Sequence, residues 1–430
     1  MQRKPFTNTH IHIFNTDCAP ERFFRILSTP WLNPVAGLTK ALLDSPSSRK
    51  AIGFFYTFAQ KTSQKKWARL VSFIHAGSRN SQLEIFRMAL EAGRLHDPSI
   101  RLVGLTLNMD FMDSKKSIRK SFETQLEEVR DIKRYYPDQF FPFLGIDPRH
   151  KSGMELKEWA EENLSSGFLR AGKPYPYFYG FKIYPAQGFF PFDPRLEEFY
   201  AYAEAYDLPV TTHCTRSGST YIGNDIEAFL PKRPRMILPQ GNPAAEDARE
   251  AIYARIQRYY AAQKVKNNRF GLNGAACDLF SHPQNYVPVL EAFPKLKLCL
   301  AHLGGSSEFL DQPESEEVKQ LRELEDKRKW LDHIRDMMKV YPRLFADISY
   351  TLSDFDKAEI LDALVPFLEE KDREGNPLGK RILFGTDFFM TEQEKKEKST
   401  YAALLENERL APWLSDFTRD NPAAYLSNIR

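Results

Sequence analysis

The sequence predicts an α/β protein built as a (β/α)₈ barrel, because short apolar segments alternate with amphipathic segments along most of its 430 residues. Such alternation of strands and helices is typical of a parallel sheet covered by helices. Eight units favour a closed barrel over an open sheet. A dinucleotide-binding sheet is disfavoured as well, since no GxGxxG turn follows the first apolar segment.

The eight expected strands are short, rich in β-branched and aromatic residues, and bounded by turn residues. They are the segments 6–14, 101–109, 140–146, 179–184, 208–213, 296–302, 344–350 and 381–387. Amphipathic segments typical of helices include 116–136, 195–206, 286–293, 316–340 and 356–368. We therefore expect one barrel domain that extends over residues 1–430.

Two connections are too long to be simple crossovers: residues 15–100 after the first strand and residues 214–295 after the fifth. Long loops of this kind are usually functional insertions. Both leave the carboxyl ends of the strands, where the active sites of barrel enzymes are built. We expect a helical cap or lid at 15–100 and a second insertion at 214–295.

The first insertion is basic, with ten lysines and arginines but only three acidic residues between positions 15 and 80. Three interpretations stay open. The segment is a helical cap with a solvated basic face, a lid that attracts an anionic substrate, or a surface for an acidic partner or anionic lipid.

The overall composition argues against several classes of protein. The formal net charge is only +3, which gives no argument for nucleic acid, and no apolar run is long enough for a membrane helix. Four cysteines without CxxC spacing favour a reducing compartment, and the first residues lack the apolar core of a signal peptide. We expect a cytoplasmic protein that acts on a small molecule, with a homo-oligomer as one alternative.

The first expected strand contains Thr9-His10-Ile11-His12, in which the two histidines are two residues apart. On a strand this spacing puts both side chains on one face, about 6–7 Å apart along the chain. Two imidazoles placed in this way can bind one cation. The pair is nevertheless weak evidence when it is taken alone, because short motifs arise by chance.

Three other expected strands end in a single ionisable residue at the tip of an otherwise apolar run: His213, His302 and Asp387. Each costs burial free energy unless it is paired or bound to a metal, so four such tips are hard to explain structurally. Histidine and carboxylate together suit Zn²⁺, Mn²⁺ or Fe²⁺. The sequence therefore predicts a divalent metal site, with zinc as the first choice and manganese or iron as alternatives.

With these residues the sequence resembles the amidohydrolase superfamily of metal-dependent TIM-barrel enzymes, and within it the branch of hydrolases, lactonases and non-oxidative decarboxylases. The resemblance extends over the whole chain. Its motifs are the HxH pair, Gly180-Phe-Lys182-Ile-Tyr184-Pro, Thr-Thr-His213, Leu298-Cys-Leu-Ala-His302-Leu-Gly-Gly, Phe384-Gly-Thr-Asp387 and the closing Asn421-Pro-Ala-Ala-Tyr. Together these motifs are specific for the superfamily, whereas none of them is specific alone.

The resemblance implies roles for the residues at the strand tips. His10, His12, His213 and Asp387 would bind the first metal, and Asp387 would also be the general base toward the water that the metal activates. His302 would be either a ligand of a second metal or a catalytic residue that polarises the substrate and donates a proton.

Lys182 decides whether one or two ions are expected. In binuclear relatives a lysine at the end of the fourth strand is carboxylated and bridges two metals. The alternatives are a lysine that binds a substrate anion and one that extends along the rim of the barrel. Tyr184 and Arg216 are further candidates for substrate contact, and Asp347 is a lesser one.

Three functions stay open at this stage. The first is a hydrolase that cleaves an amide, lactone or ester bond of a small, anionic substrate. The second is a metal-dependent decarboxylase of an unsaturated or aromatic acid. The third, a barrel that has lost catalysis and only binds a ligand, is disfavoured because the full set of ligand residues is intact.

Overall fold

The fold was analysed in a computed structural model that describes residues 4–20, 72–114, 118–216, 221–223, 225–265, 276–310, 328–393 and 395–427. Eight short parallel strands lie at the positions of the eight expected segments. They are β1 (Thr7–Ile11), β2 (Arg101–Gly104), β3 (Phe143–Ile146), β6 (Gly180–Ile183), β7 (Pro209–Thr215), β8 (Lys297–Gly304), β9 (Leu344–Asp347) and β10 (Ile382–Leu383).

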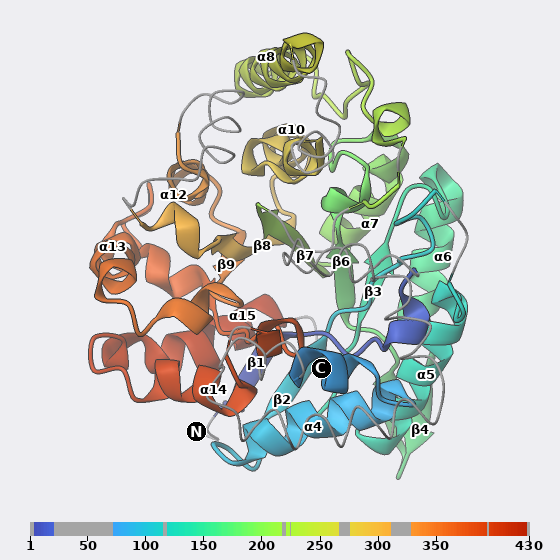
Figure 1. Ribbon diagram of the computed structural model, residues 1–430, viewed down its shortest axis with the longest axis vertical. Helices are drawn as coiled ribbons and strands as arrows, with labels where there is room; N and C mark the ends of the chain where they lie inside the picture. Colours follow the sequence, from blue (N-terminus) through green and yellow to red (C-terminus); the bar gives the residue numbers. More distant parts are fainter. Residues whose placement is uncertain are drawn as a thin grey trace.

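The strands follow one another around a ring in chain order. Six of them form one parallel sheet in the order β10-β9-β8-β7-β6-β3, and β1 pairs with β2. Two seams join these sheets: Leu102 and Leu105 bridge to Phe140 and Phe143, and Ile11 bridges to Phe388. Figure 1 shows the strands at the centre with helices around them. The predicted (β/α)₈ barrel is confirmed.

Alternate residues along each strand face opposite sides of the ring, as the two-residue period requires. The outward set includes Phe181, Ile183 and Leu298, which join the large core between strands and helices. The inward set forms a separate core that fills the barrel and contains Phe143 and Cys299.

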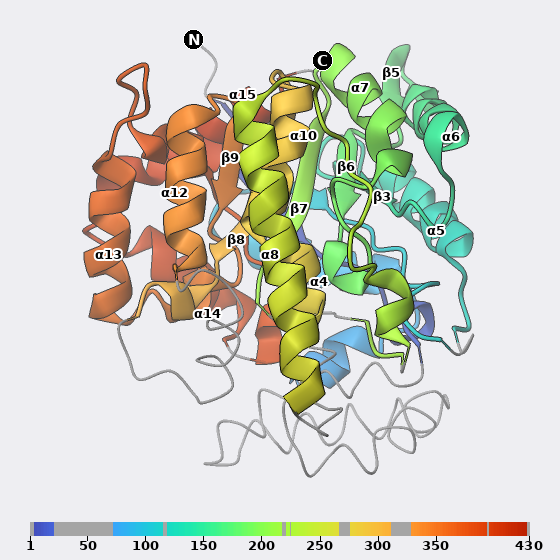
Figure 2. The same ribbon diagram turned by 90° about the horizontal axis from the view of Figure 1, so that it is seen from above.

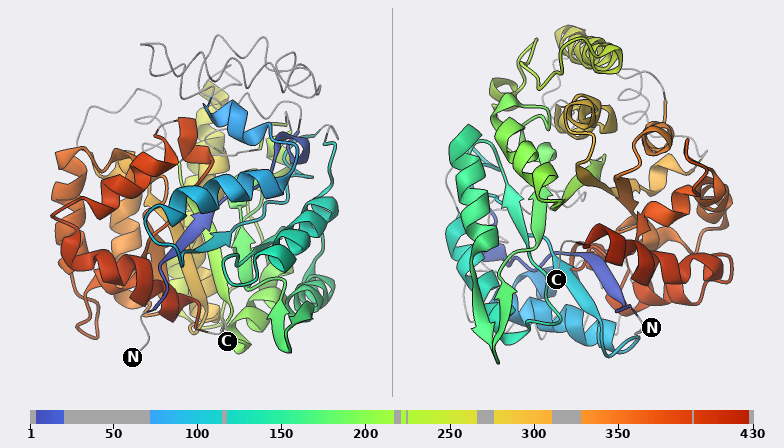
Figure 3. Two further views of the ribbon diagram at one scale, coloured as in Figure 1. Left: turned by 90° about the horizontal axis from the view of Figure 1, so that it is seen from below. Right: turned by 180° about the vertical axis from the view of Figure 1, so that it is seen from behind.

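The C-terminal helix α15 (Asn421–Tyr425) closes one end of this inner core. Its Tyr425 is 1% exposed, lies in the inner core and forms a hydrogen bond with Thr211 across 2.9 Å between the two hydroxyl groups. The first and last described segments of the chain lie at this end of the molecule (Figures 2 and 3).

The helices that cover the barrel begin where capping and acidic residues favour a helix start. Ser81 and Ser121 accept hydrogen bonds from the backbone of the first turns of two helices, and each first turn carries a glutamate. The helices are α4 (Gln82–Arg94), α5 (Phe122–Tyr135), α6 (Gly153–Ser165), α7 (Glu197–Ala205), α8 (Pro243–Val265), α10 (Val287–Ala292), α12 (Trp330–Val340), α13 (Ala358–Glu369) and α14 (Glu397–Leu405).

The structure adds an element that the sequence analysis did not predict. The antiparallel hairpin of β4 (Gly167–Arg170) and β5 (Lys173–Pro176) lies between α6 and β6. Three of the four residues of β4 are exposed, so the hairpin lacks the alternation of buried and exposed residues on which strand prediction depends.

The two expected insertions are described only in part. Residues 21–71 of the 15–100 segment lie outside the described residues, and the rest contains helical residues 72–77 and α4. In the 214–295 segment, residues 217–220, 224 and 266–275 lie outside them as well. There α8 packs on the outer side of α10, away from the strands (Figures 1 and 2). Among the described residues, no helix combines the length and apolar character needed to cross a membrane.

Candidate metal centre

The barrel brings the histidines and acidic residues of the predicted site together at the carboxyl ends of its strands. His10 is in β1 and His12 directly follows it, His213 is in β7, His302 is in β8, and Asp387 follows β10. All five are at most 5% exposed. Because parallel strands end on the same side of a barrel, residues far apart in the sequence meet here.

His10, His12 and Asp387 converge on one point. The Nε2 atoms of the two histidines are 3.3 Å apart, and each lies 3.3 Å from Oδ1 of Asp387. These three residues form one of the two groups of metal-ligating side chains found among the described residues. The other group contains His10, His302 and Asp347.

Hydrogen bonds on the far side of each ring determine which nitrogen faces Asp387 with a lone pair. Nδ1 of His12 donates to the carbonyl of Leu105 at 3.0 Å, and Nδ1 of His10 donates to Asp347 at 2.9 Å. The two Nε2 atoms are therefore unprotonated in the neutral rings. Burial, followed by the charges of neighbouring residues, holds the pKa of both histidines well below 6.5, so the rings are neutral at pH 7.

This arrangement fits a divalent cation. Two lone pairs and a carboxylate oxygen point at the same place, and Oδ1 of Asp387 has no hydrogen-bond partner among the described residues. The 3.3 Å separations agree with the spacing of about 3.3–3.4 Å between ligand atoms in tetrahedral zinc sites with bonds of about 2.0–2.1 Å. Burial raises the pKa of Asp387 well above its usual value, against the opposing effect of Lys182.

Asp347 and Ser349 connect His10 to His302. Asp347 accepts hydrogen bonds from Nδ1 of His10 at 2.9 Å and from the backbone of His302 and Ser349 at 2.9 and 3.0 Å. The Ser349 hydroxyl donates its one proton to Asp347, so it accepts from Nδ1 of His10 and from Nδ1 of His302. The sequence analysis missed Ser349. The only signal was its position two residues after Asp347, on the same face of the chain.

His302 and His213 form a pair of imidazoles next to this network. Because Nδ1 of His302 donates to Ser349, its Nε2 accepts the proton of His213 Nδ1 across 3.1 Å. That assignment leaves the lone pair of His213 on Nε2. The ring of Tyr184 stacks on His213 with centroids 4.3 Å apart. Tyr184 thus contacts His213, and its predicted contact with a substrate stays a prediction.

Lys182 lies at the tip of β6 and is 1% exposed. Its Nζ forms no hydrogen bond with any described residue. Burial lowers the pKa of this lysine to about 8, although Asp347 and Asp387 favour its charged form. A buried amine of this kind is suited either to carboxylation or to contact with an anion.

Arg216 is engaged with other side chains of the protein. Its Nε lies 3.2 Å from Glu308, and its guanidinium stacks over the Trp330 ring at 4.6 Å. It is 8% exposed. The predicted contact between Arg216 and a substrate stays a prediction.

The backbone at the strand tips is unusual in two respects. Of the six non-glycine residues with positive φ in the described part of the chain, four lie here: His302, Leu303, Tyr350 and Asp387. Such strain gathers where surrounding structure holds functional groups in place. A Cβ on Gly385 would lie 2.6 Å from Cβ of His10, so only glycine permits this approach of the last strand to the first.

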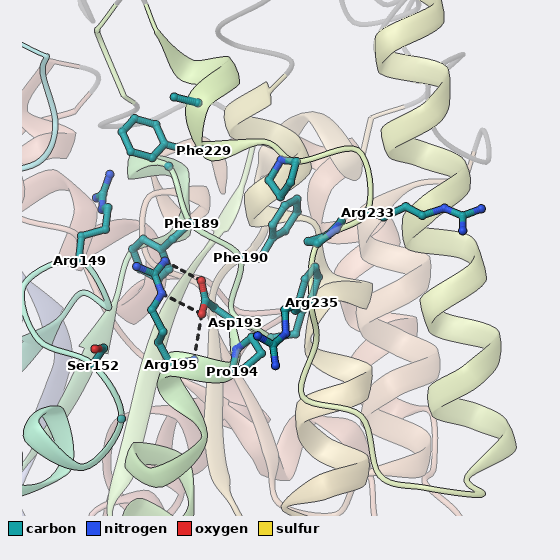
Figure 4. Close-up of a pocket in the computed structure, with 16 residues that line it drawn as sticks. Arg149, Ser152, Phe189, Phe190, Asp193, Pro194, Arg195, Phe229, Arg233 and Arg235 are labelled. Atoms are coloured by element: carbon teal, nitrogen blue, oxygen red, sulfur yellow. Dashed lines mark hydrogen bonds and ion pairs between the residues drawn. The ribbon is translucent and has the colours of Figure 1, made fainter.

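A pocket of about 790 Å³ lies to the side of the metal centre, among loops that follow β3, β6 and β7. None of the predicted site residues lines it. Figure 4 shows that Asp193, an acidic residue that lines it, is paired with Arg195. Arg149, which also lines it, is paired with Asp147.

A protein-family model described as amidohydrolase matches residues 112–426. No sequence among the curated proteins matches significantly.

Similar solved structures include a 5-carboxyvanillate decarboxylase from Novosphingobium aromaticivorans with manganese (TM-score 0.46, 11% identity, 99% of this chain and 96% of that one). A 2,6-dihydroxybenzoate decarboxylase from Rhizobium has a TM-score of 0.46 and 13% identity over 99% of both chains. A probable 2-pyrone-4,6-dicarboxylic acid hydrolase from Acinetobacter baumannii has a TM-score of 0.44 and 10% identity over 98% and 99%. These values are too low to transfer a reaction.

Proposed function

Since the chain belongs to the amidohydrolase family, we propose that it is a hydrolase that cleaves an amide, lactone or ester bond of a small, anionic substrate with the help of one divalent ion. Zinc is the first choice, with manganese and iron as alternatives, because imidazole and carboxylate ligands suit all three.

One observation carries this proposal: His10, His12 and Asp387 point two lone pairs and one carboxylate oxygen at a single place, 3.3 Å from one another. Without a cation these groups repel one another in a buried site where each has lost its contact with water. His213 would complete the ligand set through Nε2. A divalent ion in this position supplies the Lewis acidity that makes water a nucleophile near neutral pH.

Asp387 and His302 would carry out the proton transfers of this reaction. Asp387 would accept a proton from the attacking water on a carboxylate oxygen, while the water oxygen bonds to the carbonyl carbon of the substrate. When the C–N or C–O bond breaks, the same carboxyl would return that proton to the departing nitrogen or oxygen. Nε2 of His302 accepts a hydrogen bond from His213 and would hold the His213 ring in the tautomer that binds metal through Nε2. For His302 to act as the predicted proton donor, its own Nε2 must first become protonated.

The experiment combines metal analysis with isotope labelling. The purified protein is freed of metal with a chelator, reloaded with Zn²⁺, Mn²⁺ or Fe²⁺, and incubated with a panel of amides, lactones, esters and hydroxybenzoates. Hydrolysis in H₂¹⁸O puts one labelled oxygen into the product, whereas the alternative reaction, decarboxylation, releases CO₂. A protein that binds metal but turns over no substrate would support a binding role.

His12→Ala is the decisive variant, and His150→Ala is its control, because His150 lies outside the metal centre and pairs with Glu123 at 3.4 Å. We expect His12→Ala to lose metal and activity and His150→Ala to keep both. A His12→Ala protein with full metal content and full activity would contradict the proposed centre.

A further inference from the structure

Three buried nitrogen donors without partners surround one small cavity beside the metal centre. The cavity is lined by Asn108, Lys182 and Gln187, together with the rings of Tyr184 and Phe189. Nδ2 of Asn108, Nζ of Lys182 and Nε2 of Gln187 each lack a hydrogen-bond partner among the described residues. The three side chains are 4%, 1% and 1% exposed.

The donors come from separate elements near the carboxyl ends of β2 and β6, which lie on either side of β3. Asn108 follows β2, Lys182 is in β6, and Gln187 ends the 3-10 turn that follows β6. The backbone N–H of Asp110 donates to Oδ1 of Asn108 at 3.1 Å, which identifies the other atom of that amide as the donor Nδ2. The order of the strands in the barrel therefore brings the three donors together.

The three nitrogens that lack a hydrogen-bond partner share this cavity with one acidic residue, Asp147. Both oxygens of that carboxylate are engaged, since Arg149 donates to them at 2.9 and 2.6 Å and the backbone N–H of Arg149 also donates to Oδ1. Buried donors normally have partners, so three that lack them in one cavity indicate an acceptor that comes from outside the chain.

We propose that Asn108 and Gln187, next to Lys182, form the subsite that holds a carboxylate of the substrate. The proposal rests on the proposed function and specifies the substrate class of that centre. The positive charge of Lys182 and two neutral amides suit an anion, and a carboxylate oxygen accepts two or more hydrogen bonds.

The volume of the cavity limits how much of the ligand can enter it. Its volume of about 10 Å³ has room for roughly one oxygen atom the size of water. One carboxylate oxygen would enter the cavity, and the remainder of the substrate would extend beyond it past Phe189, which also lines the pocket of about 790 Å³. A planar aromatic or unsaturated acid would suit contact with this ring.

The test uses benzoate as the probe and benzamide as its neutral counterpart of similar shape. Binding of both to the zinc-loaded protein is measured by calorimetry for wild type, Asn108→Asp and Gln187→Glu, with zinc content determined on the same samples. Each substitution keeps the side-chain shape but replaces a donor with a negative oxygen. We expect benzoate affinity to fall about 10–100-fold in each variant, the range for loss of a hydrogen bond to a charged group, and benzamide affinity to change less than about threefold.

Asn163→Asp is the matched control, because Asn163 is on α6 with its amide already bonded to Arg130 and the Trp159 carbonyl. It should bind benzoate as wild type does. Unchanged benzoate affinity in both cavity variants, or no benzoate binding to wild type, overturns the proposal and leaves the cavity to water. Loss of zinc together with benzoate overturns it too, since the effect would then pass through the metal. If the wild-type protein binds no zinc, the proposed function is refuted instead. Benzoate binding to the metal-free wild type and cavity variants then tests the cavity separately.

Discussion

Substitution of Asp347 by asparagine should weaken metal binding, although Asp347 is not one of the three residues, His10, His12 and Asp387, that converge on one point. Oδ1 of Asp347 accepts from the backbone of His302 and Ser349 and from the Ser349 hydroxyl, while Oδ2 accepts from Nδ1 of His10. An asparagine keeps its oxygen toward the three donors at Oδ1. Its NH₂ group then faces His10, which must move its proton to Nε2 and lose the lone pair that faces the metal.

The expected magnitude follows from this single contact. A hydrogen bond to a charged acceptor contributes about 1.5–3 kcal/mol, and removal of such supporting partners typically costs about 10–100-fold in metal affinity. We expect Asp347→Asn to bind Zn²⁺ about 10–100-fold more weakly at pH 7. Ser349→Ala should lower the zinc affinity less than about tenfold, because Nδ1 of His10 can still donate its proton to Asp347.

The assay is competition for Zn²⁺ with a chromophoric chelator, with thermal unfolding followed by circular dichroism on the same proteins. Asp372→Asn is the control: that carboxylate is also buried, but it pairs with Arg381 at 2.9 Å, away from the predicted site residues. It should lose stability and keep wild-type zinc affinity. A folded Asp347→Asn protein with zinc affinity within threefold of wild type would refute the tautomer assignment of His10.

Three further predictions concern residues around the centre. Gly385→Ala should lower both stability and zinc affinity, because the new Cβ would lie 2.6 Å from Cβ of His10. The melting temperature and a zinc titration measure these two effects, and wild-type values for both would contradict the prediction. Lys182→Met should retain about one zinc per chain by mass spectrometry, since Lys182 belongs to the proposed carboxylate subsite, whereas a loss of half the metal would establish a binuclear centre. Asn421→Ala should lower the free energy of unfolding by about 1–3 kcal/mol in urea, because its amide satisfies two buried carbonyl groups at 2.9 and 2.7 Å, and an unchanged midpoint would count against it.

The sequence by itself determined the barrel and the residue types of its centre. Short apolar, β-rich segments are typical of buried strands, and helical segments between them favour a parallel sheet. Because parallel strands end on the same side, His10, His213 and Asp387 could be expected to meet, although 377 positions separate the first from the last (387 − 10). That inference needed no distances.

Tertiary structure decided everything that depends on which atoms of neighbouring strands approach each other. Asp347 and Ser349 set the tautomers of two histidines through contacts of about 3 Å, and no pattern in the sequence specifies the register that creates them. The sequence pattern likewise does not specify the ion pair of Arg216 with Glu308 or the lack of hydrogen-bond partners for Asn108 and Gln187 among the described residues. The periodicity of a strand indicates which face a side chain occupies. A hydrogen bond, in contrast, requires a donor–acceptor distance that is correct to within a few tenths of an ångström, and only the packing of the whole barrel defines that distance.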